Sequence, residues 1–201
     1  MSAPDLVLAS ASPRRRRLLE QLGLAFRVEA AVVDEAIPAG EDAAAHVERL
    51  ALEKARAVAA RRPGAVVIGG DTVVVLDGEI LTKPEDPADA VAMLMRLQGR
   101  EHRVETGVAV VSGSRSASAA VGVDVRFFPF DRATAEAYVA TGEPLDKAGS
   151  YGIQGCGAVL VEWIRGDYFA VMGLPVARLI GLFERFGWHY DFRGLVSREG
   201  T

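Results

Sequence analysis

Apolar and polar positions along the chain follow two periods, and their order predicts a mixed α/β fold. Short apolar runs that are typical of buried strands occur at residues 6–9, 26–33 and 65–68. Apolar residues at helical spacing occur over residues 14–22, 41–61, 87–97, 132–141 and 175–186. Residues 103–112 and 121–128 predict two strands joined by a turn at 113–118, and Asp77-Gly78 is a strong hairpin signal. Hairpins among intermixed strands and helices favour a mixed sheet over a purely parallel one.

Composition narrows the class of protein. The chain has 201 residues, of which 50% are hydrophobic and 25% charged, so it can bury a core as one domain and is neither disordered nor a coiled coil. A net charge of −4 argues against binding nucleic acid through bulk charge. The single cysteine, Cys156, excludes an internal disulfide. Since no signal peptide and no membrane-length apolar run occurs, we expect a soluble cytoplasmic protein with no membrane partner.

The first chemically unusual segment is the turn that follows the first predicted strand. Ser12 and Pro13 are both favoured at a helix N-terminus, where free N–H groups attract anions. Arg14 and Arg15 oppose the helix dipole in the first turn. A bound phosphate would reverse that penalty, because the dipole and both guanidinium groups would face it. The segment therefore predicts a phosphate site.

The next two arginines have a plainer explanation. Arg16 lies four residues before Glu20, a spacing that predicts a solvated ion pair of small energetic worth. Arg17 is expected on the same solvated face. The alternative is that all four arginines, Arg14 and Arg15 included, form a solvated face.

Lys54 interrupts the apolar stripe of the helix predicted at 41–61. It lies seven residues after Val47 and four after Leu50, so it shares their face. A lysine in that position can reach into a cleft toward an anion. The alternative is a lysine that snorkels from the edge of the stripe.

Carboxylates follow two of the predicted strands. Asp71 comes after two glycines at the end of the 65–68 strand, a common place for a metal ligand or a general base. The glycines permit a close approach of backbone or an unusual turn, and residues 72–76 are expected to continue extended. The return of the following hairpin can bring Lys83 near Asp71. Asp34 and Glu35 follow the second strand and offer oxygen ligands suited to Mg²⁺ or Mn²⁺. The alternatives are a turn-forming aspartate and a solvated acidic pair.

A long polar segment punctuated by glycines runs over residues 146–155. Its length and composition suggest a shaped loop that carries recognition. Gln154 has both a donor and an acceptor, so it could read the edge of a nucleobase, whereas a phosphate site would favour cations.

Taken together, these motifs resemble the Maf family of nucleoside triphosphate pyrophosphatases, within it the branch that acts on dTTP and UTP. The matching stretches are LASASPRR (8–15), DE (34–35), LEKAR (52–56), GDTVVVLDGEILTKP (70–84), GREHRVETGVAV (99–110), GEPLDKAGSYGIQG (142–155) and VMGLP (171–175). They cover nearly the whole chain in the right order. Lys147 and Gln154 stand where the branch acting on 7-methyl-GTP typically has cysteine and glutamate. One departure is Thr82, where many members have glycine.

The resemblance implies a fold and a domain organisation. The expected architecture is an elongated mixed β-sheet with flanking helices and two lobes around a central cleft, similar to inosine triphosphate pyrophosphatases. Residues 1–193 would form this single two-lobed domain, and residues 194–201 a polar C-terminal tail. The resemblance also suggests a homodimer.

The resemblance further assigns roles to residues. Asp71 matches the proton acceptor that activates water, and Glu35 and Asp71 match the carboxylates near a divalent cation, Mg²⁺ or Mn²⁺. The phosphate-binding positions of the family fall on Ser10, Arg14, Arg15, Lys54 and Lys83. Positions tied to substrate choice fall on Arg14, Thr72 and Gln154. Ser10 and Thr72 enter only through the resemblance.

The implied reaction is attack of water on the α-phosphorus of a nucleoside triphosphate, which gives the monophosphate and pyrophosphate. dTTP and UTP are the expected substrates, and modified pyrimidine nucleotides are further candidates, as in house-cleaning of the nucleotide pool. Two alternatives belong to other classes. One is a regulatory role in septum formation, for which the family is named, and the other is a nucleotide sensor without turnover.

Overall fold

The structure is a computed structural model of the chain and describes residues 3–197. Strands and helices intermix along the sequence, as the hydrophobic pattern predicts. Their order is β1 (Leu6–Leu8), α1 (Pro13–Gln21), β2 (Phe26–Val28), α2 (Ala43–Ala59), β3 (Val66–Leu76), β4 (Glu79–Leu81), α3 (Pro87–Leu97), β5 (Glu101–Ser112), β6 (Arg115–Phe127), α4 (Arg132–Val139), the 3-10 helices η1 (Glu143–Asp146), η2 (Ala148–Ser150) and η3 (Gly155–Leu160), β7 (Val161–Arg165), α5 (Tyr168–Val171), α6 (Val176–Glu184), β8 (Trp188–Tyr190) and β9 (Leu195–Ser197).

The chain divides into two compact units, and the division falls within β3, β5 and β6. The first unit comprises Met1–Asp71, Thr106–Val121 and Gly173–Thr201. The second comprises Thr72–Glu105 and Gly122–Met172. Each long strand therefore contributes residues to both units. The expected central cleft stays a prediction.

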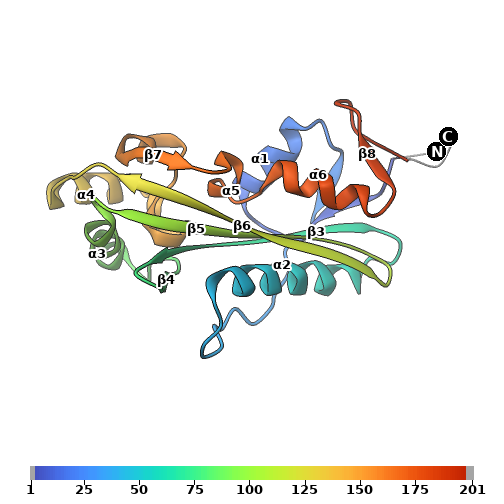
Figure 1. The fold of residues 1–201 in the computed structure, drawn as a ribbon, viewed down its shortest axis with the longest axis horizontal. Coiled ribbons are helices and arrows are strands. Elements are labelled where there is room, and N and C mark those ends of the chain that lie inside the picture. Colours follow the sequence, from blue (N-terminus) through green and yellow to red (C-terminus); the bar gives the residue numbers. More distant parts are fainter. Residues whose placement is uncertain (1–2, 198–201) are drawn as a thin grey trace. The chain divides into compact units, whose positions relative to one another are not determined.

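The first unit contains the parallel part of the sheet. β1 pairs in parallel with β2 on one side and with β3 on the other, and Leu8 at the end of β1 lies opposite Ile68 of β3. Helix α2 covers one face of these strands, and α1 and α6 lie on the other face (Figure 1). The core beneath α2 is built from small and β-branched side chains, whose buried members are Val7, Ala9, Ala51, Ala55, Val58, Ala65, Val67, Ala109 and Val111.

Helix α2 lies in direct contact with the sheet at two glycines. A Cβ placed on Gly69 of β3 would lie 2.0 Å from the Ala51 carbonyl oxygen. A Cβ placed on Gly107 of β5 would lie 2.0 Å from the Val47 carbonyl oxygen. Any side chain at either position would overlap the helix backbone, so the absence of a Cβ sets how closely α2 can approach.

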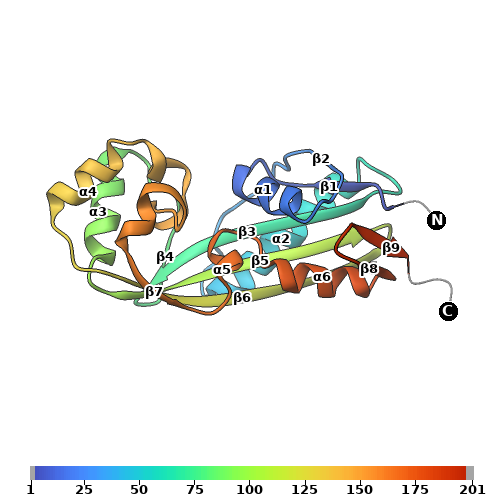
Figure 2. The same cartoon turned by 90° about the horizontal axis from the view of Figure 1, so that it is seen from above.

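The second unit contains antiparallel pairs. β3 turns into β4 through Asp77 and Gly78, whose φ angles of 53° and 82° are those of a two-residue hairpin turn. β7 pairs antiparallel with β6, and helices α3 and α4 lie side by side (Figure 2). The sheet therefore holds both parallel and antiparallel pairs, and the prediction of a mixed α/β fold is confirmed.

Three local predictions were wrong. The strand predicted at 26–33 ends at Val28. Residues 113–118 are not all turn, because β6 already begins at Arg115. The strand predicted to end at the glycines before Asp71 is not interrupted there: β3 accommodates both glycines and joins the stretch 72–76, which is extended as predicted.

The C-terminal segment contains more structure than a polar tail suggests. Within the segment expected as a tail, β9 pairs antiparallel with β8, so that Leu195 lies opposite Tyr190. Leu195 is buried, and the Asp191 carboxylate accepts hydrogen bonds from the backbone N–H of Gly194 and Arg193. Residues 198–201 lie outside the described residues. Over residues 3–197, no helix is both long and apolar enough to cross a membrane.

The contact of α2 with the sheet gives the first testable prediction. Gly69→Ala and Gly107→Ala should each lower the free energy of unfolding by about 1–3 kcal/mol or more, because backbone must move to admit the methyl group. Gly181→Ala is the matched control, since Gly181 lies exposed in α6 and, apart from its chain neighbours and the backbone of its own helix, nothing lies within 4 Å of its Cβ position. It should raise stability by roughly 0.5–1 kcal/mol. Urea unfolding of the three variants measures this, and equal effects at all three glycines would contradict it.

Candidate active site

The turn between β1 and α1 is built as its sequence predicts. Ser12 is the N-cap of α1 and its hydroxyl accepts the Arg15 N–H, while Pro13 opens the helix. Arg16 forms the expected exposed pair with Glu20, with 2.7 Å between Nε and Oε1. The first turn of α1 contains no acidic residue, so its dipole is left for an anion.

Arg14 and Arg15 are half-buried, whereas Arg16 and Arg17 are exposed. This difference matches the division that the helical spacing predicts. It excludes a single solvated face shared equally by all four arginines.

The Arg15 side chain crosses β3 at Gly70. A Cβ on Gly70 would lie 3.0 Å from Arg15 Nε, so the glycine leaves room for the guanidinium. Nε donates to the Gly173 carbonyl oxygen at 2.7 Å, and Nη1 donates to the Ser10 hydroxyl at 3.0 Å. Burial lowers the pKa of Arg15, and the negative charge of Asp71 acts in the opposite direction. Ser10, which entered only through the resemblance, thus lies beside Arg15.

Lys54 meets two carboxylates. Its Nζ lies 2.6 Å from Asp71 Oδ1 and 2.6 Å from Glu35 Oε1. The side chains of Lys54 and Asp71 are only 11% and 13% exposed, whereas Glu35 is 60% exposed. Lys54 therefore does not snorkel to solvent from the edge of its stripe. Three of the predicted site residues converge on one point of the first unit.

The place of this cluster follows from the parallel strands. β1 ends opposite Ile68, so the stretch Gly69–Asp71 of β3 extends beyond its carboxyl end. The chain that leaves β1 forms the start of α1, and the chain that leaves β2 leads to Glu35. Ligand sites in α/β proteins commonly lie at the carboxyl ends of parallel strands.

The two carboxylates fit one kind of metal site. Over residues 3–197, no group of three or more His, Cys, Asp or Glu side chains is placed to hold a metal ion by itself. Glu35 and Asp71 converge closely enough to share one ammonium group. Mg²⁺ is usually held by one or two carboxylates together with water and substrate phosphates. The donor set therefore suits a divalent cation shared with a phosphate chain, and not an all-protein cage.

The other predicted residues belong to the second unit. Thr72 is the next residue of β3, and Lys83 is exposed after β4. The Gly149 N–H donates to the Thr82 carbonyl oxygen at 3.0 Å, which joins the chain beside Lys83 to the 146–155 segment. Gln154 is half-buried in the extended conformation just before η3. The expected approach of Lys83 to Asp71 stays a prediction.

Comparison with known proteins identifies the family. Residues 5–186 match the family described as Maf-like protein. The chain belongs to the Maf family. A relative from Symbiobacterium thermophilum is 52% identical, and the match covers 92% of this chain and 95% of the relative. A relative from Moorella thermoacetica is 54% identical over 90% and 95%, and one from Pelotomaculum thermopropionicum 48% identical over 92% and 98%. All three relatives are named dTTP/UTP pyrophosphatase.

The Maf resemblance drawn from the motifs is thereby confirmed. The roles that the resemblance assigns to Ser10, Arg14, Arg15, Glu35, Lys54, Asp71, Thr72, Lys83 and Gln154 stay predictions. The structure brings Ser10 together with Arg15, and Lys54 together with Glu35 and Asp71.

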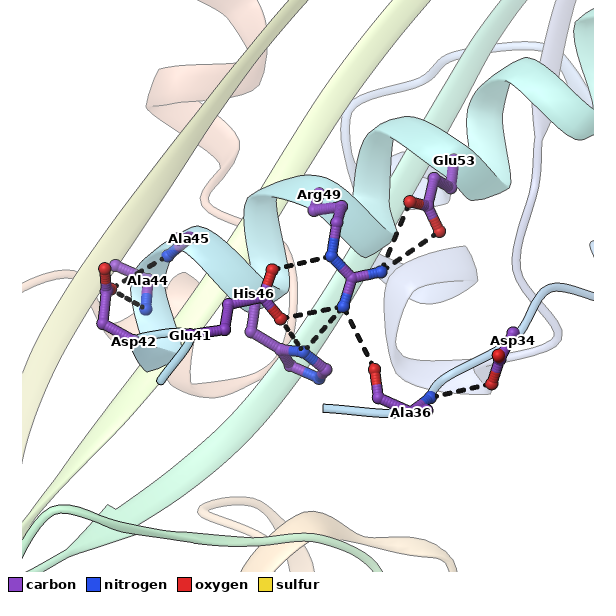
Figure 3. Close-up of polar contacts among 9 residues, drawn as sticks. All are labelled: Asp34, Ala36, Glu41, Asp42, Ala44, Ala45, His46, Arg49 and Glu53. Atoms are coloured by element: carbon purple, nitrogen blue, oxygen red, sulfur yellow. Dashed lines mark hydrogen bonds and ion pairs between the residues drawn. The ribbon is translucent and has the colours of Figure 1, made fainter. Parts of the chain in front are cut away.

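A group that the sequence patterns did not predict holds the Glu35 segment against α2. Arg49 donates through Nε and Nη2 to the two oxygens of Glu41, at 2.7 and 2.8 Å, and through Nη2 to the Ala36 carbonyl oxygen at 3.2 Å (Figure 3). Glu53, one helical turn after Arg49, accepts from Nη1 at 3.3 Å. One guanidinium thus fixes both sides of the turn between Ala36 and Glu41. The sequence offers only a weak signal for this, the i,i+4 pair of Arg49 and Glu53.

The same group perturbs the charge of Glu41. Hydrogen bonds from Arg49 and from the buried ring of His46 lower the pKa of Glu41 to about 2, and the pKa of Arg49 is raised in turn. The ion pair is therefore retained well into the acidic range.

A pH-dependent stability follows from the Glu41 carboxylate. Because its folded pKa is depressed from 4.5 to about 2, its stabilisation is present above pH 4.5 and is lost as the pH falls through this range. Urea unfolding should show the wild type more stable than Glu41→Gln at neutral pH, with the gap narrowing below 4.5. Glu20→Gln, at an exposed ion pair, is the control and should show little gap at any pH. A gap for Glu41→Gln that does not change with pH would count against the Arg49 contact.

Proposed function

We propose that this chain hydrolyses dTTP and UTP to the nucleoside monophosphate and pyrophosphate. The observation that carries the proposal is the convergence of Lys54 on the carboxylates of Asp71 and Glu35, beside a helix N-terminus that bears Arg14 and Arg15. A phosphate chain and an attacking water need this combination of cations and carboxylates. The printed names of the three relatives support the same reaction and substrates. We place the activity in the cytoplasm, where nucleoside triphosphates are available.

In the proposed reaction, the first unit binds the phosphates. The positive end of the α1 helix dipole and the guanidinium groups of Arg14 and Arg15 attract the phosphate oxygens. Ser10 holds the Arg15 guanidinium through its hydroxyl, and the Gly173 carbonyl holds it from another side. Because Arg15 is already oriented, little side-chain entropy is lost when it binds phosphate. Lys83 is the further cation proposed for the phosphates.

Asp71 is the proposed general base. Its carboxylate would take a proton from the water that attacks the α-phosphorus, and Lys54 would orient the carboxylate through the 2.6 Å contact. Glu35 and Asp71 are the residues that would hold Mg²⁺ or Mn²⁺. Such an ion, when bound, neutralises phosphate charge and acidifies a coordinated water.

The proposed base-reading residue is Gln154. Its side-chain amide has one donor and one acceptor, which complement O4 and N3–H of uracil and thymine. Cytosine presents the opposite pattern, so a fixed amide would reject it. Thr72 is the second proposed selectivity position in this unit.

Turnover and its loss test the proposal most directly. Wild-type protein should release pyrophosphate from UTP and dTTP in the presence of Mg²⁺. Asp71→Asn keeps the size of the side chain but removes its basicity, so kcat should fall at least ~10²-fold. A thermal unfolding curve like that of the wild type shows that the variant is folded. A protein that binds UTP without releasing pyrophosphate would instead be a sensor, and near-normal kcat in Asp71→Asn would remove the general base from this position.

Matched arginines on α1 test phosphate binding. Arg14→Ala should lower kcat/KM for UTP by about 2–4 kcal/mol of transition-state stabilisation, which is roughly 30- to 1,000-fold. Lys83→Ala should act similarly. Arg17→Ala is the control, because Arg17 is exposed on the same helix and should have almost no effect. A comparable loss in Arg17→Ala would mean that the first turn of α1 does not face the phosphates.

A further inference from the structure

One carboxylate and one phenol hold the backbone on both sides of Gln154. Tyr138 Oη accepts the Gly152 N–H at 3.1 Å and donates to Glu143 Oε1 at 2.8 Å. Glu143 Oε2 accepts the Cys156 N–H at 2.9 Å, and Oε1 accepts the Gly157 N–H at 3.1 Å. The backbone is therefore held two residues before Gln154 and again two and three residues after it.

The glycines of this segment fit closely against the same two side chains. A Cβ on Gly155 would lie 2.5 Å from Glu143 Oε2, and Gly155 has a φ of 70°, which favours glycine. A Cβ on Gly157 would lie 2.4 Å from Tyr138 Oη. Tyr138 itself is buried, with 6% of its surface exposed. The segment is thus shaped to receive this pair of side chains.

Every hydrogen bond among these residues is donated toward Glu143, either directly or through the Tyr138 hydroxyl. Burial raises the pKa of Tyr138, which stays protonated and can donate to Glu143. Burial also disfavours the charged form of Glu143, but the N–H of Cys156, the hydroxyl of Tyr138 and the N–H of Gly157 outweigh it and lower the pKa of Glu143. A carboxylate offers only acceptors, so it can take all three donors at once. A glutamine of the same shape cannot, because its NH₂ group would face one of these donors.

We propose that Glu143, together with Tyr138, is a positioning residue for base selection: the pair fixes the backbone on both sides of Gln154 and thereby holds its amide in the orientation that prefers uracil and thymine to cytosine. This inference rests on the proposed function. Neither side chain is assigned contact with the substrate. A base-reading amide discriminates only when it cannot turn over, since a flipped amide would pair with cytosine.

The central experiment compares two nucleotides in one near-isosteric variant. Glu143→Gln should reduce the ratio of kcat/KM for UTP to that for CTP at least ~10-fold. Glu136→Gln is the matched control, because Glu136 lies on α4 near Tyr138 in sequence and its side chain is 58% exposed. It should leave the ratio unchanged. If the role of Glu143 is only structural, thermal stability and activity on both nucleotides will fall together and the ratio will stay constant, which overturns the proposal.

A second variant keeps the proposal testable if Glu143→Gln does not fold. Tyr138→Phe removes only the hydroxyl that links Gly152 to Glu143, and it should also lower the UTP-to-CTP ratio. Hydrogen exchange gives a readout without turnover, since peptides that cover residues 152–157 should exchange faster in both variants than in Glu136→Gln. Unchanged exchange there would overturn the proposed clamp.

The reference variant Gln154→Glu distinguishes a failure of the base-reading role of Gln154 from a failure of the positioning role of Glu143 and Tyr138. If Gln154→Glu leaves the ratio unchanged, Gln154 does not read the base and the proposed function is wrong at this residue. If Gln154→Glu lowers the ratio while folded Glu143→Gln and Tyr138→Phe do not, the proposed function stands and the positioning role is wrong.

Discussion

The candidate site depends on how closely helix α2 approaches the sheet. Gly69 lies against the Ala51 carbonyl oxygen, and successive residues of a strand point to opposite faces. Asp71, two residues on, therefore faces the same helix. Lys54 lies about one helical turn after Ala51, so its ammonium meets the Asp71 carboxylate at 2.6 Å. If a side chain at position 69 held α2 farther from the sheet, the ammonium group of Lys54 would not reach the Asp71 carboxylate.

The residue between Gly69 and Asp71 serves the other face. Gly70 points away from α2, and its missing Cβ leaves room for Arg15 of α1. Over three residues, the run Gly69–Asp71 thus makes room for α2 on one face of the strand and for Arg15 of α1 on the other, and it supplies one carboxylate. β1 no longer covers this stretch, because its last residue pairs with Ile68. Side chains on both faces of β3 can therefore reach the edge of β3 that β1 leaves unpaired.

Local periodicity made much of this site predictable. The helical stripe through Val47 and Leu50 singled out Lys54, and helical phase separated Arg14 and Arg15 from their neighbours. The glycines before Asp71 left two interpretations open, an unusual turn or a close approach of backbone, because the two look alike in sequence. Only tertiary packing distinguishes them.

Contacts between distant residues and backbone atoms could not be predicted in this way. Arg49 acts on a carbonyl oxygen thirteen residues earlier. Glu143 accepts from backbone N–H groups that lie thirteen and fourteen residues later. An N–H or C=O group is the same in every residue, so neither contact leaves a pattern in the side chains. Both contacts nevertheless hold segments that carry predicted site residues, Glu35 in one case and Gln154 in the other.

The charges of the site limit what it can bind unaided. Glu35 and Asp71 offset Lys54 and Arg15, so these four side chains together are close to neutral. A bound triphosphate brings about four negative charges near neutral pH. In the proposed reaction Arg14 and Lys83 supply two of the missing positive charges, and one divalent cation on Glu35 and Asp71 supplies the other two. Besides proton transfer, the two carboxylates would thus bind the divalent cation that the phosphates also bind. Without the carboxylates, no protein ligand would hold that cation beside the phosphates.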